Sequence, residues 1–268
     1  MIPVEQGGHS SVRSVSRALS LLTLFDEDHP IRTVRELVGS AELPKTTLLR
    51  LLQTLENFGY LYMRPEGRYC LGPTLIRLSR AVDEVWRLPV AADATMEALR
   101  EQTRETINLY VLEGKSRVCV AQKQGLESIR YVIPIGVPMP LWGGASAKVL
   151  LATRTGEFVD EILLGGQKDV RYRDWFLEEL ERTRIDCVAV SHGERDQAAS
   201  AVAAPIQAGE KTFAALAISG PTSRFTPDRV SEISELVKRA AQQIQDSFAG
   251  QMDGEAHGSA WQIASKAR

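Results

Sequence analysis

Hydrophobic residues in the first part of the chain recur every three or four positions, which is the spacing of one face of an α-helix. The first such stripe predicts a helix that begins near Ser14, a residue suited to an N-terminal cap. A second, shorter helix is expected over residues 33–38, and Gly39 is placed to end it. The stripe of the first helix consists of Val15, Leu19, Leu22 and Phe25.

A third helix is expected after Pro44, which fits a first helical turn because its missing N–H would have no partner there. Gly59 is placed to end this helix. Two short strands, residues 60–63 and 68–71, flank the turn sequence RPEG and predict a β-hairpin. The buried face of the third helix is expected to consist of Leu48, Leu51, Leu52 and Leu55.

The pattern is helical again over residues 74–103, where Pro89 must lie at a helix start or a kink and so predicts two helices. Beyond this segment, short hydrophobic runs bounded by turn residues indicate strands, and these follow one another too closely for helical crossovers. An antiparallel sheet is therefore expected. The expected strands cover residues 106–114, 117–125, 128–136, 186–191, 200–207 and 212–220. The expected helices cover residues 146–154, 156–164, 173–184 and 226–248, the last capped by Thr226.

Composition places the chain among ordinary globular proteins, since 44% of its 268 residues are hydrophobic and 25% are charged. This length allows one large domain or two of ordinary size. No hydrophobic run reaches the roughly 18 residues of a membrane span, and the N-terminus lacks the hydrophobic core of a secretion signal. A cytoplasmic protein with no membrane partner is therefore expected.

Charge is unevenly distributed along the chain, although the net charge is only −2. Residues 44–80 hold six basic and two acidic side chains, a net charge of +4. Residues 81–268 hold 22 basic and 26 acidic side chains, a net charge of −4. A small basic module is thus joined to a larger acidic one, and a local basic patch is the electrostatic footprint of nucleic-acid binding.

Two helices, a turn, a third helix and a hairpin within about 65 residues describe a winged helix-turn-helix. The third helix keeps a polar face opposite its buried stripe. Lysine and arginine neutralise phosphates or bind guanine, glutamine pairs with adenine, and leucine can contact a thymine methyl. The alternative is a set of ordinary solvated charges on a small helical subdomain. The candidate DNA-binding residues lie on the third helix, on the hairpin and near the start of the first helix: Arg13, Arg17, Lys45, Thr46, Thr47, Leu49, Arg50, Gln53, Arg64 and Arg68.

Candidate catalytic and metal-binding residues are few. Cys70, Cys119 and Cys187 lie far apart in strand-like hydrophobic contexts, which are typical of buried thiols, and the four histidines show no ligand spacing. The sequence also lacks a G-x-S-x-G elbow and a phosphate-binding glycine loop. No catalytic residue, cofactor or metal is therefore expected. A cysteine-based reductase and a sensor that acts only through protein contacts remain as alternatives.

Several segments together resemble the IclR family of bacterial transcription regulators, from residue 14 to residue 248. The segments that resemble the DNA-binding half of that family are SVSRALSLLTLF, TVRELVGSAELPKTTLLRLLQTLENFGYL and GRYCLGPTLIRLS. The segment PMPLWGGASAKVLLA resembles the entrance to the family's effector pocket. The segment HGERDQAASAVAAPIQAGEKTFAALAISGPTSRFT resembles its closing signature. The resemblance implies an α+β fold in which a winged helix-turn-helix is joined by a helical linker to a GAF-like antiparallel sheet with flanking helices.

The resemblance also implies a division of the chain and an assembly into homodimers or homotetramers. The expected parts are a disordered N-terminus (1–13), a DNA-binding domain (14–73), a helical linker (74–103), an effector-binding and oligomerisation domain (104–250) and a flexible tail (251–268).

A small acidic effector would, by the same resemblance, bind against the sheet of the second domain. Glycine and alanine near residue 144 permit close backbone approach at an expected helix N-terminus, where free N–H groups favour a carboxylate, and serines supply further donors. Tight packing of small residues is the alternative. The candidate effector-binding residues are Leu141, Trp142, Gly144, Ala145, Ser146, Ser191, His192, Glu194, Ser200, Ala201, Ala203, Ala217 and Ser219.

Two positions depart from the family pattern, namely Ala147, where glycine is frequent, and His192, where aspartate is common. Trp142 beside the pocket loop suggests an aromatic or larger acid as effector, although a structural tryptophan is an equal alternative. The function expected from the sequence is a regulator of a catabolic or metabolic operon, repressor or activator. It would bind a pseudo-palindromic operator in double-stranded DNA and respond to a small carboxylate or aromatic acid.

Overall fold

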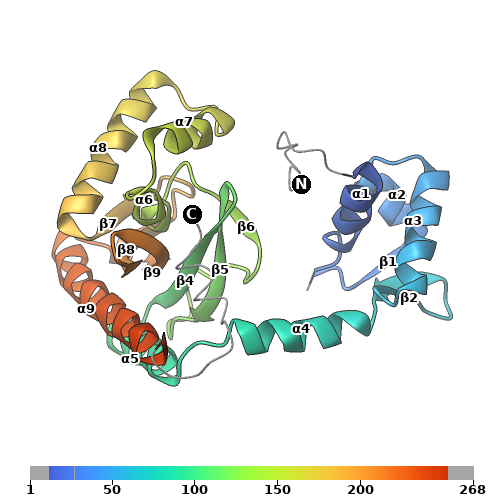
Figure 1. Ribbon diagram of the computed structural model, residues 1–268, viewed down its shortest axis with the longest axis horizontal. Helices are drawn as coiled ribbons and strands as arrows, with labels where there is room; N and C mark the ends of the chain where they lie inside the picture. Colours follow the sequence, from blue (N-terminus) through green and yellow to red (C-terminus); the bar gives the residue numbers. More distant parts are fainter. Residues whose placement is uncertain (1–11, 27, 253–268) are drawn as a thin grey trace. The chain divides into compact units, whose positions relative to one another are not determined.

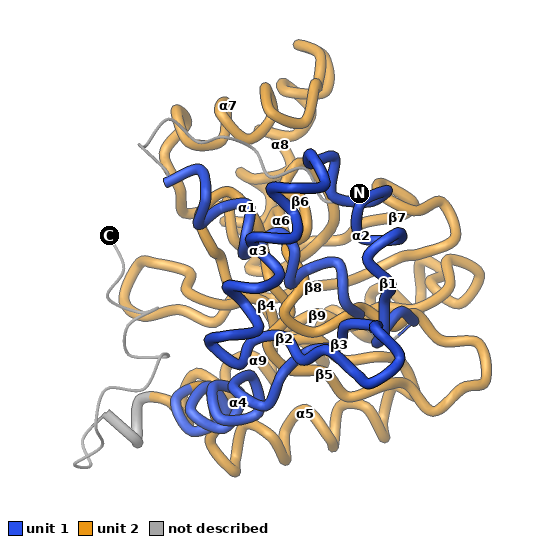
Figure 2. Tube along the Cα trace, turned by 90° about the vertical axis from the view of Figure 1, so that its right-hand side faces the viewer, with its two compact units in different colours: residues 1–85 blue, residues 86–268 orange. Residues whose placement is uncertain are grey.

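The computed structural model describes residues 12–26 and 28–252 (Figure 1). The chain divides into two compact units, Met1–Val85 and Trp86–Arg268, which Figure 2 colours separately. Within the described part, no helix is long and hydrophobic enough to span a membrane. Each unit has its own core and is considered by itself.

The first unit is a set of short helices on a three-stranded antiparallel sheet of order β1-β3-β2. Its core is built from leucines of the first three helices and from Leu61 and Tyr69 of the sheet. Leu48, Leu52 and Leu55 are buried and Leu51 packs against them, so the expected inner face of the third helix is confirmed. The elements are α1 (Arg13–Leu22), β1 (Ile31–Thr33), α2 (Val34–Ala41), α3 (Lys45–Asn57), β2 (Leu61–Met63), β3 (Arg68–Leu71) and α4 (Thr74–Val85).

The ends of the first two helices differ from the sequence expectation. Ser14 lies inside α1, whose N-cap is Val12 and has no side-chain cap. Gly39 lies inside α2, which ends only at the left-handed residue Glu42, because the helix continues to bury its inner face past the glycine. The start of α2 is fixed by a capping box in which Thr33 and Glu36 bond to each other's backbone N–H groups.

The hydrophobic stripe of α1 is only half buried. Leu21 and Phe25 lie in the core, whereas Val15 and Leu19 are exposed. Strand β1 was missed by the sequence prediction because three residues are too short to show a period of two. It pairs with β3 and so adds a third strand to the expected hairpin.

The second unit is built on a six-stranded antiparallel sheet of order β6-β5-β4-β9-β8-β7. The elements are α5 (Val90–Thr103), β4 (Thr106–Glu113), β5 (Ser116–Lys123), β6 (Pro138–Pro140), α6 (Ala145–Leu151), α7 (Gly156–Gly165), α8 (Val170–Asp186), β7 (Ala189–His192), β8 (Ala199–Ala208), β9 (Lys211–Pro221), the 3₁₀ turn η1 (Thr222–Arg224) and α9 (Pro227–Met252).

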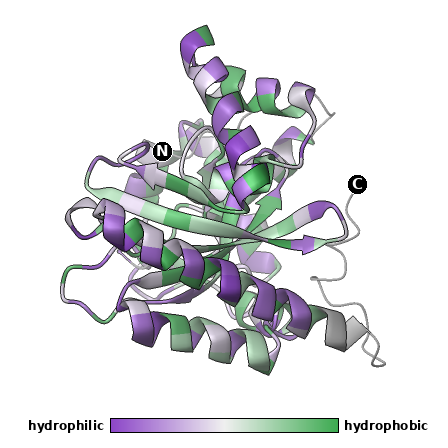
Figure 3. Ribbon diagram, turned by 90° about the vertical axis from the view of Figure 1, so that its left-hand side faces the viewer, coloured by the Kyte–Doolittle hydropathy of each residue, from purple (hydrophilic) through white to green (hydrophobic). Residues whose placement is uncertain are grey.

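Helices cover both faces of this sheet. On one face, α5 and α9 enclose a core that includes Met96 and Ile244; on the other, α6, α7 and α8 enclose a core that includes Leu150 and Phe176. Figure 3 shows strands coloured mainly as hydrophobic behind helices that carry both hydrophobic and hydrophilic stretches. Strands that are hydrophobic along most of their length are expected in a sheet that is covered on both faces. The antiparallel sheet and the α+β architecture are as predicted.

Residues 128–136 do not form the strand expected there. The loop is instead held by a bond from Gln122 Nε2 to the carbonyl of Ile133 (2.9 Å) and by one from Arg224 Nη2 to the carbonyl of Ile129 (3.0 Å). The edge strand is β6, which begins two residues later. The sequence pattern was strand-like because Tyr131 and Ile133 turn inward, against the second core.

The structure also bears on the expectations for Pro89, for two of the cysteines and for the two ends of the chain. Pro89 is the N-cap of α5, so it separates two helices as predicted. Cys187 is exposed and left-handed at the end of α8, not in a strand, whereas Cys119 is buried as expected. Arg13 and residues 251–252 belong to α1 and α9; the remainder of the expected disordered N-terminus and flexible tail lies outside the described residues, apart from Val12.

Candidate nucleic-acid interface and effector pocket

The outer face of α3 presents polar side chains to solvent. Lys45, Thr46 and Arg50 are exposed beside Leu49, whose side chain is 41% exposed. Gln53 is exposed too and donates to Asn57 Oδ1 at 3.1 Å. This face lies opposite the buried leucines, and it combines cationic, amide, hydroxyl and hydrophobic groups of the kinds that contact DNA bases and phosphates. Thr47, the remaining candidate of this helix, is partly buried.

The wing, which is the hairpin formed by β2 and β3, contains a pair of ion pairs that the sequence analysis did not predict. Arg64 and Arg68 both form ion pairs of 2.9 Å with the same exposed carboxylate, Glu66. A hydrogen bond from its own backbone and the two guanidiniums lower the pKa of Glu66 below its ordinary value. The two arginines therefore share one carboxylate at the tip of the wing. Arg13 and Arg17, the other basic candidates, lie in the first two turns of α1.

The second unit contains a pocket on the side of the sheet covered by α6. Its walls come from β4, β5, β7, β8 and β9, from the start of α6, and from the loops that join β5 to β6 and β7 to β8. The pocket volume is about 50 Å³. Its lining residues are Tyr110, Arg117, Tyr131, Ile133, Gly144, Ala145, Ser146, Ser191, Arg195, Asp196, Ala199, Ser200, Ala201, Ala217 and Ser219.

The structure brings eight of the thirteen candidate effector residues to this pocket. These are Gly144, Ala145, Ser146, Ser191, Ser200, Ala201, Ala217 and Ser219. Leu141 and Ala203 are buried in the neighbouring core and do not line the pocket, and neither do Trp142, His192 and Glu194. A role of the eight in effector binding stays a prediction.

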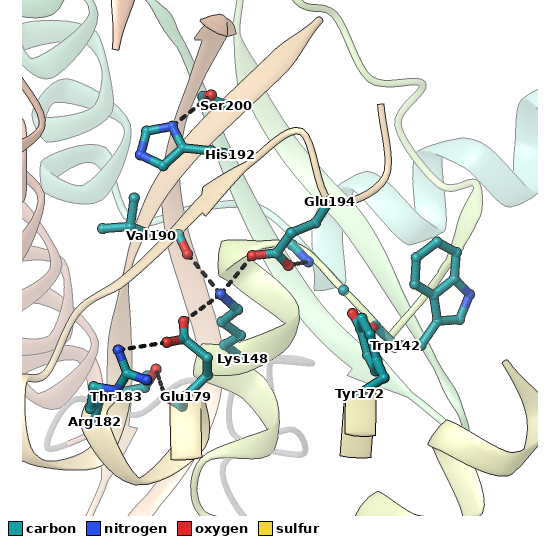
Figure 4. A network of polar contacts seen from close by, with 12 residues as sticks. Trp142, Lys148, Tyr172, Glu179, Arg182, Thr183, Val190, His192, Glu194 and Ser200 are labelled. Carbon is teal, nitrogen blue, oxygen red and sulfur yellow. Dashed lines mark hydrogen bonds and ion pairs between the residues drawn. The ribbon is translucent and has the colours of Figure 1, made fainter. Parts of the chain in front are cut away.

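Trp142 lies outside the pocket and contacts Lys168 and Tyr172. Its indole ring lies against the ammonium of Lys168 (3.8 Å to the ring centroid), and its carbonyl accepts a hydrogen bond from Tyr172. Figure 4 shows the ring turned away from the neighbouring polar network. The structure therefore gives no support to the expectation that this tryptophan selects an aromatic effector.

Glu194 and Lys148 form the centre of that network. Lys148 Nζ, with its side chain only 1% exposed, lies 2.6 Å from both Glu179 Oε2 and Glu194 Oε1, and it donates to the carbonyl of Val190 at 2.8 Å (Figure 4). The second oxygen of Glu194 accepts the N–H of Gly144 at 2.7 Å. The network joins α6, α8 and the β7–β8 loop, because each supplies one of the charged groups.

Arg117 is a buried cation of the pocket whose set of partners is incomplete. Its side chain is buried, with 2% of the residue exposed, and Nη1 donates to the carbonyl of Gly143 at 2.9 Å. Within the described part of the chain, its buried Nε has no hydrogen-bond partner. Burial lowers the pKa of the guanidinium to about 10, which leaves it charged at neutral pH. A buried, incompletely paired cation is costly unless an anion joins it.

Hydroxyl groups line the rest of the pocket. Ser219 Oγ accepts from Asn108 Nδ2 (2.9 Å), and Ser200 Oγ donates to Thr222 Oγ1 (3.1 Å) and contacts His192 Nδ1 (3.1 Å). His192 is thus a neighbour of a pocket serine and not a lining residue. Ser146 and Ser191 form no side-chain hydrogen bond with other residues that the structure describes, so their hydroxyls remain available as donors.

The sequence reading missed seven lining residues. One of them, Arg117, carried a usable signal, since it lies two positions before Cys119 and alternate residues of a strand share a face. A charged residue on the buried face of a strand marks an unusual site. The others come from the loop mistaken for a strand, from β4, from the start of β8, or from the segment 191–200, which was expected at the pocket without these residues being singled out: Tyr110, Tyr131, Ile133, Arg195, Asp196 and Ala199. Among the described residues, no group of three potential metal ligands occurs.

Comparison with known proteins agrees with these two units. A model of the IclR helix-turn-helix domain matches residues 14–65, and one of the bacterial transcriptional regulator IclR C-terminal domain matches residues 73–246. The HTH-type transcriptional regulator KdgR of Escherichia coli is 30% identical over 243 residues, covering 87% of this chain and 92% of that protein.

Two solved structures share the fold. A transcriptional regulator from Alicyclobacillus acidocaldarius is 26% identical with a TM-score of 0.73, covering 88% of this chain and 99% of that one. An IclR homologue from Microbacterium hydrocarbonoxydans, crystallised with 4-hydroxybenzoate, is 21% identical with a TM-score of 0.72 and the same coverage. At that identity the second likeness shows the fold alone.

A winged helix-turn-helix followed by a helix-flanked antiparallel sheet defines a DNA-binding transcription regulator, and this class is what the matched domains and relatives share. The chain belongs to the IclR family of transcription regulators. The alternative of a cysteine-based reductase is set aside, because the matched families and relatives are regulators and not enzymes.

Proposed function

We propose that this regulator changes its affinity for an operator when a small organic acid binds in the pocket of the second unit. The observation that carries the proposal is the incompletely paired guanidinium of Arg117 in a pocket lined by four serines. A carboxylate would satisfy the buried N–H group and accept further bonds from the hydroxyls. Charge-assisted bonds of this kind are roughly twice as strong as neutral ones.

The pocket favours an acid of a few carbon atoms over an aromatic ring. Its volume of about 50 Å³ holds only a few water-sized groups, since one water needs roughly 10–15 Å³ on the same measure. A homologue crystallised with 4-hydroxybenzoate supports an acidic ligand for this fold, although its ring is larger than the space found here. Trp142, outside the pocket, adds no aromatic surface.

On DNA, the outer face of α3 would lie in the major groove. Arg50 and Lys45 supply groups for guanine or phosphate, Gln53 supplies one for adenine, and Leu49 meets a thymine methyl. The arginines of the wing would reach the adjacent backbone. Two copies of the chain would present two such helices to the half-sites of a pseudo-palindromic operator, as symmetric helix-turn-helix dimers do.

The Lys148 network supplies a physical link between the pocket and the rest of the second unit. Gly144 lines the pocket and donates to Glu194, which shares its lysine with Glu179 of α8. An acid that displaces or stiffens the β7–β8 loop would therefore act on α6 and α8 together. Reciprocity requires that DNA change the affinity for the acid by the same factor as the acid changes the affinity for DNA.

The proposal is tested on the full chain with duplexes selected from a random library. Binding to the selected sequence should fall steeply with salt, because phosphate contacts release counterions. Arg50→Ala should weaken this binding by about 1–3 kcal/mol and relax the base preference, whereas Arg171→Ala on α8 should leave both unchanged. Small carboxylates should then shift the measured affinity for the duplex. Salt-independent binding, or no effect of any acid, would contradict the corresponding half of the proposal.

A further inference from the structure

Two arginines, one deep and one exposed, line the same small pocket. Arg117 enters from β5 and is buried, whereas Arg195 lies on the β7–β8 loop and is exposed. The two guanidiniums are close enough for the charge of Arg195 to lower the pKa of Arg117, in addition to the larger effect of burial. Among the described residues, Arg195 forms no hydrogen bond or ion pair.

The acidic residues of this region offset the two cations only in part, although the charge of Glu194 acts against the lowering of the Arg117 pKa. Glu194 is held by Lys148 and by the N–H of Gly144. Asp196, the one carboxylate among the described lining residues, accepts the N–H of Ala198 at 3.0 Å. It offsets only one of the two positive charges. The pocket therefore carries an excess of positive charge that is divided between its inner wall and its exposed side.

One backbone N–H at the start of α6 is already engaged. The N–H of Gly144 already donates to the carboxylate of Glu194, so a ligand carboxylate there would meet a like charge. This excludes the N–H of Gly144 only, and the wider expectation of a carboxylate at the start of this helix stays a prediction. The strongest attraction for an anion comes from the side chains of Arg117 and Arg195. Neutral lining residues of the same pocket include Ser146, Ala201, Ala217 and Ser219.

We infer that the effector is an acid with two anionic groups, one bound by Arg117 at the inner wall and the other by Arg195 on the exposed side. This inference rests on the proposed function and specifies its ligand class. Each guanidinium presents a planar fork of donors that matches a carboxylate, and the serines of the pocket would bind polar groups of a short linking chain. A monocarboxylate would satisfy Arg117 but leave Arg195 without a partner.

Isothermal titration calorimetry of the full chain tests this with length-matched probes: succinate against butyrate, and malonate against propionate. At least one dicarboxylate is expected to bind about tenfold more tightly than its monocarboxylate partner, which is the effect of one additional charge-assisted contact. Arg195→Gln should reduce this preference to less than about threefold, because only the dicarboxylate loses a direct contact. It is an exposed residue, so the variant is expected to fold.

Arg117→Gln should abolish binding of both kinds of acid, and Arg171→Gln on α8 serves as the matched control. Equal affinity for the paired acids, or a preference that survives Arg195→Gln, would overturn the two-anion inference and leave the proposed function intact. If none of the four acids binds, while the control variant and the parent chain show the same unfolding transition, the inference is overturned and the small-acid proposal loses its support as well.

Discussion

Lys148 Nζ and Glu194 Oε1 lie 2.6 Å apart, and the lysine is almost completely enclosed by the second unit. The lysine belongs to α6 and the glutamate to the β7–β8 loop, so this ion pair fastens a pocket wall to the helix behind it. A lysine this deeply buried is stable only because two carboxylates and a carbonyl surround its ammonium group. The pair therefore controls both the stability of the unit and the position of the pocket loop.

Replacing this lysine should destabilise the second unit strongly. Lys148→Met leaves Glu194 without a cation and Glu179 with only the exposed Arg182, and breaking a buried pair in this way costs about 3–5 kcal/mol. The measurement is urea unfolding followed by tryptophan fluorescence, which does not report on the first unit because all four tryptophans lie at residue 86 or beyond. Lys115→Met is the control, since its pair with Glu161 is exposed and contributes less than about 1 kcal/mol. Equal losses in the two variants would refute this account.

Gly144→Ala should damage the pocket more than an ordinary glycine substitution. This residue has φ +99° and ψ 150°, a conformation that side chains avoid, and a Cβ would lie 2.9 Å from Arg117 Nη2. We expect a loss of about 1–3 kcal/mol in unfolding free energy together with weaker acid binding, because the guanidinium must move.

Gly114→Ala is the matched control for that change. Gly114 also has a positive φ, of +56°, but no atom lies within 4 Å of the Cβ position. It should cost no more than about 1–2 kcal/mol and leave acid binding intact. Retention of full acid binding by Gly144→Ala, measured by calorimetry, would show that the guanidinium does not hold the ligand.

The elements that the sequence predicted correctly are those whose hydrophobic side chains form one simple pattern. The leucines of α3 repeat at helical spacing because that helix buries a single face, so both its core and its polar face were visible. The strands β4, β5, β8 and β9 were visible because their short hydrophobic runs are bounded by turn residues. The antiparallel order of neighbours followed from their short connections.

What the sequence could not supply is the pairing between distant segments. Arg117 reaches the pocket only because β5 lies beside β4 in a particular register, and Gly144 is close to Glu194 only after α6 has packed on the sheet. The loop over residues 128–136 alternates like a strand, yet side-chain bonds to Gln122 and Arg224 hold it outside the sheet. The shared carboxylate of Glu66 likewise depends on the shape of the turn.

Two substitutions in the wing should change DNA affinity in opposite directions. Arg68→Ala removes a cation that we propose to bind phosphate, so it should weaken binding to all sequences equally and reduce the salt slope by about 1. Glu66→Gln removes the carboxylate that engages Arg64 and Arg68, and so should strengthen binding and steepen the salt dependence. Fluorescence anisotropy with a non-specific duplex over a range of salt measures both, with Glu157→Gln on α7 as control. Weaker binding by Glu66→Gln would mean that its ion pairs position the wing.

Thiol reactivity should separate the cysteines by their surroundings. Burial raises the pKa of the Cys119 thiol to about 12, and its sulfur contacts the carbonyl of Ala121 at 3.4 Å. Because the thiolate is the reactive form, Cys119 should resist iodoacetamide at pH 8 and even at pH 9, where a thiol of ordinary pKa is largely ionised. Cys187 is exposed and should be alkylated first.

Peptide mapping by mass spectrometry follows both sites, and Cys187→Ser should remove the fast phase. Addition of urea should make Cys119 reactive, whereas rapid alkylation of native Cys119 would show that the core around β5 opens and would revive a redox role for this thiol.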